Sequence, residues 1–283
     1  MKVEQSPKAY TGRVIGSENI AGLVQYASNA QAEAGYRADR AINCLNAARI
    51  VGNLRHMYDS CNVEPISAKV GGGAATGTAG DTNVLYSGAN EYTYHIKGTQ
   101  TITAPSLGAD GLNISMDQTD NDGMEFVLGG LKSFGRYVTT VGTSDAVEFR
   151  VKFSIADVSG TDDCAIGFRK MEAFQAAIDN YDEMACFNVI SGDINIETIL
   201  NNGATTTTDT TDNWADAATK ELKVRVYKSG RVKYFIDGVA PTATAQFTFD
   251  AGEVIIPFFY FLHSADVAGE VNIQEIEFNR YVE

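Results

Sequence analysis

Carboxylate pairs on one strand face are the first candidate for chemistry in this chain of 283 residues. A retaining glycoside hydrolase holds two carboxyl groups about 5–5.5 Å apart. The nearest local arrangement is Glu275 and Glu277, which flank Ile276 and therefore share one face of a predicted strand. We expect both carboxylates to lie in solvent on this last strand. The local spacing therefore indicates no catalytic pair.

Aromatic side chains in loops are candidates for stacking on sugar rings. The chain has one tryptophan, Trp214, which follows the polar run 205–212 that we expect to be an exposed loop. Tyr181 lies in a second predicted loop or helical turn, 171–182, between two predicted strands. Trp214 and Tyr181 are therefore the candidate glycan contacts.

A cluster of hard oxygen ligands precedes the turn at Gly123. Asp117, Asp120 and Asp122 could contribute carboxylates to an irregular Ca²⁺ site. An EF-hand aligned on Gly123 would need an acidic residue at its twelfth position, where this chain has Gly129. We expect a solvated turn here, with the irregular Ca²⁺ site as the alternative.

Nucleophilic and metal-ligating side chains are scarce. The chain has three histidines, and its four cysteines (Cys44, Cys61, Cys164 and Cys186) lack the paired spacing of a structural zinc site. We expect four reduced, mostly buried thiols, with a Cys164–Cys186 disulfide as the alternative. His263 follows an apolar segment and is expected at the edge of the core. The sequence therefore predicts no enzyme and no cofactor.

Basic side chains gather on one predicted hairpin. Its two strands alternate apolar and polar residues, so their polar positions share an outer face. This face could bind an acidic partner, or it could be an ordinary solvated face with lysines that protect a sheet edge. The candidate docking residues here are Lys223, Arg225, Arg231 and Lys233.

The charge balance excludes some partners. The chain holds 36 acidic and 22 basic side chains, a net charge of -14. Because phosphate repels such a surface, we expect no nucleic-acid partner. No apolar run approaches the roughly 20 residues of a membrane-spanning helix, and no secretory signal is visible, so we expect no membrane partner.

The N-terminal part differs from the remainder. Residues 1–60 carry a net charge of +2, and apolar residues recur at helical spacing over about 30–58. This stripe predicts a partly helical arm, 1–65, that packs on its own domain or docks on a partner. A glycine-rich linker, 66–83, follows. The candidate docking residues of the arm are Ile42, Leu45, Arg49, Leu54 and Met57.

From residue 84 onward the pattern is typical of β-strands. Residues 147–155 alternate apolar and polar side chains, and 222–227 and 231–236 form a predicted hairpin around Lys228-Ser229-Gly230. Short strands with Gly, Asp and Asn turns, and no long helices between them, predict an antiparallel β-sandwich over 84–283.

The order of these motifs carries a family resemblance. Ala165-Ile166-Gly167-Phe168-Arg169 is followed by the hairpin, which ends at Asp237-Gly238, and by Ile256-Pro257-Phe258. This order resembles the concanavalin A-like, laminin-G-type jelly roll found in virion structural proteins of tailed phages. The resemblance implies a jelly-roll β-sandwich and a place in a phage particle. Glycoside hydrolases of similar fold use a Glu-x-Asp-x-x-Glu pattern, which this chain lacks.

Two functions remain open at this point. The first is a non-enzymatic capsid decoration protein, assembled into the virion in the host cytoplasm and anchored by residues 1–65. Its partners would be the major capsid protein, neighbouring copies of itself in a homo-oligomer, or both. The alternative is a carbohydrate-binding module of the tail or adsorption apparatus, with a host-surface glycan as partner.

Overall fold

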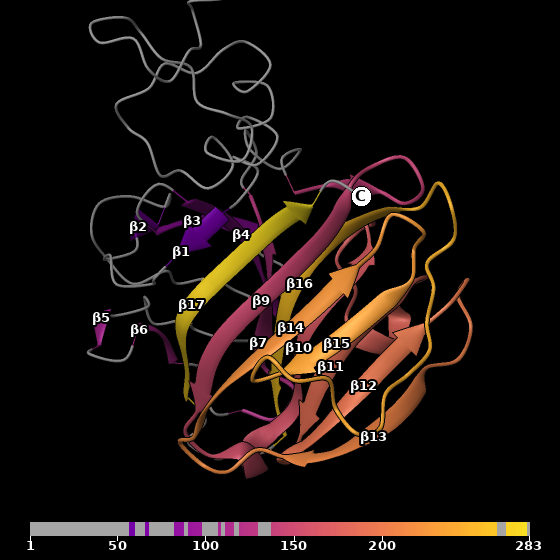
Figure 1. The fold of residues 1–283 in the computed structure, drawn as a ribbon. Helices are drawn as coiled ribbons and strands as arrows, with labels where there is room; N and C mark the ends of the chain where they lie inside the picture. Colours follow the sequence, from indigo (N-terminus) through magenta and orange to yellow (C-terminus); the bar gives the residue numbers. More distant parts are fainter. Residues whose placement is uncertain are drawn as a thin grey trace, which may run out of the picture. The chain divides into compact units, whose positions relative to one another are not determined.

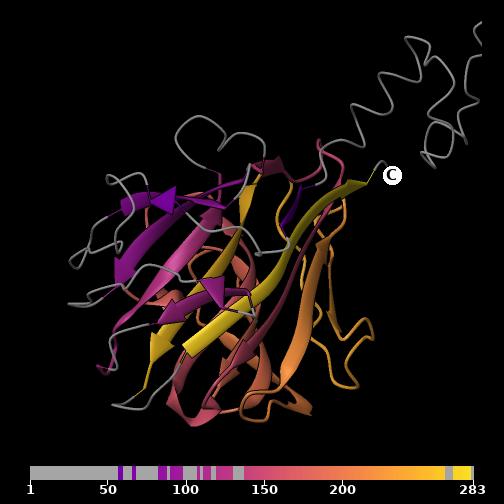
Figure 2. The same ribbon diagram turned by 90° about the vertical axis from the view of Figure 1, so that its left-hand side faces the viewer.

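The predicted antiparallel jelly-roll β-sandwich is confirmed in a computed structural model of the chain. The structure describes residues 57–59, 66–67, 82–87, 90–97, 107–108, 111–115, 119–129, 137–264 and 270–281. All of them belong to one compact unit, His56–Glu283. Two sheets pack face to face, and the ladders between their strands are antiparallel (Figures 1 and 2).

The first sheet has seven strands among the described residues, and β9, β14, β15 and β17 lie in front in Figure 1. We refer to it as the seven-stranded sheet. Strand β1 (Met57–Asp59) pairs with β17 beside the main path. The main path runs through β15 (Val232–Ile236), β14 (Thr219–Val226), β9 (Ala146–Ile155), β17 (Glu270–Tyr281), β6 (Gly111–Ser115) and β5 (Leu107–Gly108).

The second sheet has ten strands in the described part of the chain. We refer to it as the ten-stranded sheet. Strand β8 (Thr139–Thr140) pairs with β16 beside the main path. The main path runs through β13 (Thr206–Asn213), β12 (Asp193–Ile199), β11 (Met184–Ile190), β10 (Thr161–Lys170), β16 (Val254–His263), β7 (Gly123–Leu128), β4 (Asn90–Lys97), β3 (Thr82–Ser87) and β2 (Ile66–Ser67).

The core between the sheets is built from alternate residues of each strand and is rich in aromatic rings. In β9 the odd-numbered residues from Val147 to Ile155 are buried, as the alternation predicts. Edge-to-face ring pairs join the two sheets, with centroids 5.5 Å apart for Phe153 and Phe259 and 5.5 Å apart for Phe187 and Tyr234.

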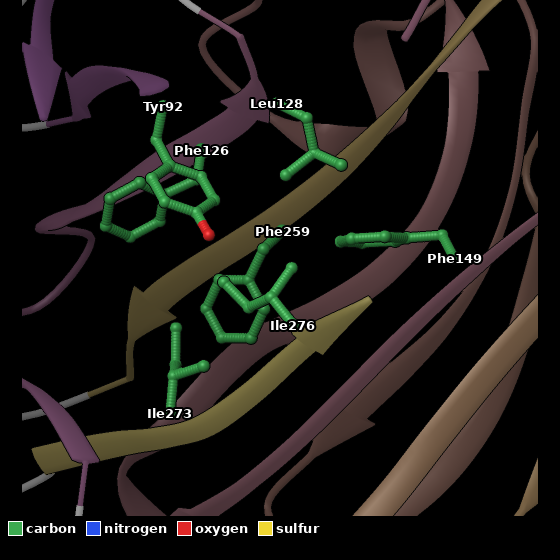
Figure 3. A pocket seen from close by; sticks show the side chains of 7 residues that line it. All are labelled: Tyr92, Phe126, Leu128, Phe149, Phe259, Ile273 and Ile276. Carbon is green, nitrogen blue, oxygen red and sulfur yellow. The ribbon is translucent and has the colours of Figure 1, made fainter. Parts of the chain in front are cut away.

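A small cavity lies within this core. Its volume is about 10 Å³, no more than the space of one water molecule. Figure 3 shows its apolar lining side chains turned toward one another between the sheets. Because the lining offers almost no polar partner, the cavity is a packing gap and not a ligand site. Its lining residues are Tyr92, Phe126, Leu128, Phe149, Phe259, Ile273 and Ile276.

The outer face of the ten-stranded sheet is also covered. The segment 171–182, which we call the strap, leaves β10, makes one 3₁₀ turn, η4 (Ile178–Asn180), and returns to β11. Ile178 and Tyr181 of the strap are buried against outward residues of the sheet, including Cys186, Phe258 and Tyr260. This explains why β11 and β16 are apolar on both faces. A loop or helical turn at 171–182 is as predicted.

Some predicted boundaries differ from the structure. Met57 begins β1, paired with Phe278, so the predicted helix does not extend to 58. Strand β2 and the first two residues of β3 lie within the predicted linker 66–83, so the sandwich begins before residue 84. The polar run 205–212 is not a loop: most of it forms β13, whose threonines suit an edge strand. The arm residues Ile42, Leu45, Arg49 and Leu54 lie outside the described residues.

Two of the cysteines lie on neighbouring strands and are free thiols. Cys164 on β10 is buried in the core between the sheets, whereas Cys186 on β11 is buried under the strap. Because the two side chains point to opposite faces of one sheet, a Cys164–Cys186 disulfide is excluded. Cys44 and Cys61 lie outside the described residues.

None of the helices in the described ranges is long and apolar enough to cross a membrane.

Candidate functional site

The outer face of the seven-stranded sheet centres on Arg150 of β9. Its guanidinium donates three hydrogen bonds to carboxylates on two neighbouring strands: Nε to Glu277 (2.6 Å), Nη1 to Glu221 (2.6 Å) and Nη2 to Glu275 (2.8 Å). The register explains this arrangement, because Arg150 is directly opposite Glu277 on β17 and diagonal to Glu221 on β14. The guanidinium is thereby fixed in one orientation.

An irregularity in β17 makes this arrangement possible. The register shifts between Ile273 and Glu275, so Ile273 and Ile276 both face the core although one is odd-numbered and the other even-numbered. Glu275 and Glu277 consequently both face outward, as predicted. They are not simply solvated, however, because Arg150 binds both.

The Arg150 guanidinium is held in its charged form. Partial burial alone would lower its pKa, but the hydrogen bonds to the three glutamates raise the pKa above its usual value. The group is therefore a permanent, oriented donor at the surface.

A hollow of about 430 Å³ lies beside this cluster. Two further ion pairs stand in its wall: Lys220 lies 3.7 Å from Asp237, and Lys152 lies 3.8 Å from Glu275. The Asp237-Gly238 turn forms another part of the wall, and both residues have positive φ (49° and 81°), which a short hairpin turn requires. The lining residues are Arg150, Lys152, Thr219, Lys220, Glu221, Asp237, Gly238 and Glu275.

The hollow is electrically balanced, because its lining contains three cationic and three anionic side chains. It offers fixed donors from Arg150 and the lysines beside fixed acceptors from the carboxylates. Such a lining can hydrogen-bond an uncharged ligand rich in hydroxyl groups, which both donate and accept.

The predicted basic stripe lies next to this hollow. Lys223 and Arg225 are on the outer face, as predicted, but both bind Glu148 of β9, at 3.8 and 2.5 Å. Both cations also lie over the ring of Phe235. Lys233 is exposed opposite Arg225. An acidic partner would therefore have to compete with Glu148 for Lys223 and Arg225.

Arg231 lies apart from these residues at the turn, where its guanidinium is 4.6 Å from the ring centroid of Tyr227. The structure therefore brings together Lys223, Arg225 and Lys233 and leaves Arg231 outside the group.

The two predicted glycan contacts are wrong, because both rings are buried. Trp214 is 3% exposed, contacts Phe153 in the core and donates its Nε1 hydrogen to the carbonyl of Ala218. Tyr181 has no exposed surface, and its hydroxyl donates to Glu125. Their polar sequence neighbours concealed this burial.

The predicted calcium position does not form a ligand cage in the described residues. Asp117 lies outside them. Asp120 is exposed and accepts a hydrogen bond from Asn121, whereas Asp122 is buried. Within the described ranges no group of three or more His, Cys, Asp or Glu side chains could hold a metal ion. His263 is buried at the end of β16, with its ring edge-on to Phe261, as expected for a core-edge histidine.

Sequence reasoning missed a second polar group, on the outer face of the ten-stranded sheet. Nδ2 of Asn188 (β11) donates to Asp163 of β10 (2.5 Å) and to Glu197 of β12 (2.9 Å). Burial raises the pKa of Asp163 to about 6 and that of Glu197 to about 7, although Asn188 opposes both shifts. No local spacing reveals this group, because it joins three strands.

Comparisons with known proteins give the following likenesses. No protein-family model matches the chain, and a search of curated proteins finds no match. Similar solved structures include the carbohydrate recognition domain of Emp47p (TM-score 0.45, 13% identity, 65% of this chain and 88% of that chain). An alginate lyase from Pseudomonas aeruginosa is similar with a TM-score of 0.44 and 13% identity, and the match covers 62% of this chain and 84% of that chain. A protein of unknown function from Shewanella oneidensis is similar with a TM-score of 0.44 and 15% identity, and the match covers 86% of this chain and 95% of that chain.

Proposed function

We propose that this protein is a carbohydrate-binding module that binds a neutral glycan in the hollow on the outer face of the seven-stranded sheet. The observation that carries the proposal is the Arg150 cluster beside that hollow. Three glutamates hold the guanidinium in place, so its donors and the neighbouring acceptors are already arranged before a ligand arrives.

The chemistry of the lining favours a sugar over a charged ligand. The lining itself holds three cations and three carboxylates, so it carries no excess charge that would select an anion or a cation. Vicinal hydroxyl groups match a paired cation and carboxylate, because one hydroxyl can donate to the carboxylate while its neighbour accepts from the cation. The volume is within the range of about 300–1,000 Å³ typical of small-ligand sites.

The affinity for a glycan depends on how far the hollow is open to water. The hollow is open and its charged groups are hydrated, so each new hydrogen bond replaces one to water. We therefore expect weak binding, with Kd on the order of 1 mM for one short oligosaccharide, corresponding to about -4 kcal/mol.

The proposal can be tested by a glycan array followed by titration of the best neutral oligosaccharide, monitored by NMR. Lys220→Ala removes a donor from the wall of the hollow and should weaken binding at least tenfold. Lys233→Ala, on the same sheet but outside the lining, is the matched control and should leave Kd unchanged. An array without a neutral hit, or equal binding by Lys220→Ala, would overturn the proposal.

The location of the protein is a separate question. The predicted place in a phage particle, and the predicted docking of the arm on a capsid protein, stay predictions. Quantitative mass spectrometry of purified particles tests them. Hundreds of copies per particle would support a decoration role, a handful would support a tail component, and absence would contradict both.

A further inference from the structure

A buried ionic cluster lies beneath the strap. Oε1 of Glu125 (β7) accepts a hydrogen bond from Nε of Arg169 (β10) at 2.6 Å. Its Oε2 accepts from the hydroxyl of Tyr181 and lies 3.7 Å from Nζ of Lys97 (β4). The side chains of Lys97, Glu125 and Arg169 are 4%, 0% and 1% exposed. These groups are removed from water by the strap and the sheet together.

The charges in this cluster do not balance. Lys97 and Arg169 bring two positive charges, whereas Glu125 brings one negative charge. Backbone carbonyls bind further donors of both cations. Nη1 of Arg169 donates to Lys170 at the end of β10 (2.9 Å) and to Glu172 of the strap (3.4 Å), and Nζ of Lys97 donates to Gln175 of the strap. A buried excess cation is costly, because neutral carbonyls replace only part of its hydration.

The pKa of Lys97 reflects this environment. Burial and the neighbouring Arg169 lower the pKa, and they outweigh the opposing effect of Glu125.

Aromatic rings of the strap complete the cover. Phe174 stacks in parallel on His95 of β4, with centroids 4.6 Å apart and an interplanar angle of 4°. The Arg169 guanidinium lies 5.4 Å from the centroid of Phe174 and 4.4 Å from that of Tyr181. The strap therefore presents a flat ring and a carbonyl to a surface that holds a histidine ring and excess positive charge.

The middle of the strap is attached through side chains. Besides the contacts of Lys97 and Arg169, the hydroxyl of Tyr260 donates to the carbonyl of Ala176 (3.4 Å). The backbone bond to β16 lies at the start, from the amide of Met171 to the carbonyl of Val254 (2.7 Å). Local opening of the strap with the sheets still folded must also release the buried side chains of Ile178 and Tyr181.

We propose that the face beneath the strap is a second binding site, for a ligand whose ring carries one carboxylate, and that the strap closes this site when no ligand is bound. The carboxylate would neutralise the excess charge of Lys97 and Arg169 in place of the strap carbonyls. The ligand ring would replace Phe174 on His95. A monoanion fits, because one negative charge balances the cluster.

The planar guanidinium also favours a carboxylate, which it can bind with two parallel hydrogen bonds. This site is independent of the hollow on the other sheet, which binds neutral ligands under the proposed function.

The strap competes with the ligand, so weakening the strap should strengthen binding. The full chain and its Phe174→Ala variant would be titrated with D-glucuronate and with benzoate, which share a ring and a carboxylate but differ in the kind of ring. D-Glucose and benzyl alcohol are the neutral controls. We expect at least one carboxylate to bind Phe174→Ala at least tenfold more tightly than the wild type, because losing the contacts of Phe174 with His95 and Arg169 lowers the cost of opening. Preference for one probe identifies the ring.

Lys97→Met in the Phe174→Ala background is the matched test of charge. It removes the excess cation and should reduce carboxylate binding at least tenfold. If Phe174→Ala does not fold, as judged by circular dichroism, Phe174→Leu replaces it. Failure of a folded strap variant to bind either carboxylate, or equal binding of charged and neutral probes, would overturn the proposal. Lys220→Ala should not affect this binding, so the two proposed sites can fail separately.

Discussion

The two outer faces of the sandwich use the same residue types in opposite environments. On the seven-stranded sheet, Arg150 is 15% exposed and shares its charge among three glutamates that are 21–27% exposed. On the ten-stranded sheet, Arg169 and Glu125 are 1% and 0% exposed. Water screens the first cluster and is excluded from the second, so the same ion pair contributes little in one place and is indispensable in the other. The first face is suited to reversible contact with a hydrated ligand.

The largest expected effect on stability is at the outer face of the ten-stranded sheet, which the strap covers. Glu125→Ala leaves Arg169 and Lys97 buried without a counter-ion, and we expect it to lower the free energy of unfolding by about 3–5 kcal/mol. Urea unfolding followed by circular dichroism measures this loss. A loss below about 1 kcal/mol would remove the contrast between the two faces, because it would place water beneath the strap.

A smaller loss should follow from Tyr181→Phe. This change removes a hydroxyl that donates to the buried Glu125 carboxylate, and such bonds to charged groups contribute about 1.5–3 kcal/mol. Neutral-glycan binding should stay unchanged, since Tyr181 is on the opposite side of the sandwich from the hollow. Reduced glycan binding by a folded Tyr181→Phe variant would show that the two faces are not independent.

The pH dependence of stability should also come from the ten-stranded sheet. Asp163, Glu183 and Glu197 have pKa values raised by burial to about 6, 7 and 7, whereas unfolded carboxyls titrate near pH ~4. The folded state therefore binds more protons between these values. The free energy of unfolding should fall as the pH rises from about 4 to about 7 and then level off.

Glu197→Gln should flatten part of that fall, because the amide keeps an oxygen for Asn188 but cannot ionise. Thermal unfolding between about pH 4 and 8 measures the slope. Glu275→Gln, on the other sheet, is the control and should keep the wild-type slope. A stability that instead rises with pH through this window would contradict the assignment.

The smallest effect on stability is expected at the outer face of the seven-stranded sheet. Glu275→Ala leaves Arg150 with Glu221 and Glu277, so we expect a loss of about 0–1 kcal/mol that shrinks further in high salt. Urea unfolding at low and high ionic strength tests both points. A loss comparable with that of Glu125→Ala would mean that the surface cluster is a structural core and not a binding surface.

The sequence allowed much of the fold to be predicted where one face of a strand is buried. Strands β9, β14 and β15 alternate apolar and polar residues, so the sequence predicted both the strands and the side chains that face the core. Strand β13 was missed because its threonines and aspartates carry no apolar period, as befits an edge. Met57 was assigned to a helix because a stripe at helical spacing includes it, yet pairing with β17 decides its conformation.

The candidate site was much less predictable, because its groups come from distant parts of the chain. Arg150 lies 71 residues from Glu221 and 127 from Glu277, and only the strand order makes them neighbours. Trp214 shows the converse error: a polar sequence context indicated exposure, whereas its large ring fills a gap in the core beside Phe153. The local pattern of a strand shows which of its side chains share a face. Which distant side chains meet depends on the order of the strands in the sheet.

The opposite orientations of two cysteines on neighbouring strands give this protein a pair of internal reporters of motion. Cys186 is covered by the strap, whereas Cys164 is enclosed between the sheets. A thiol reagent should therefore reach Cys186 whenever the strap lifts, and Cys164 only when the sheets separate. Labelling rates resolved by peptide mass spectrometry would separate local opening from global unfolding in the unmodified chain.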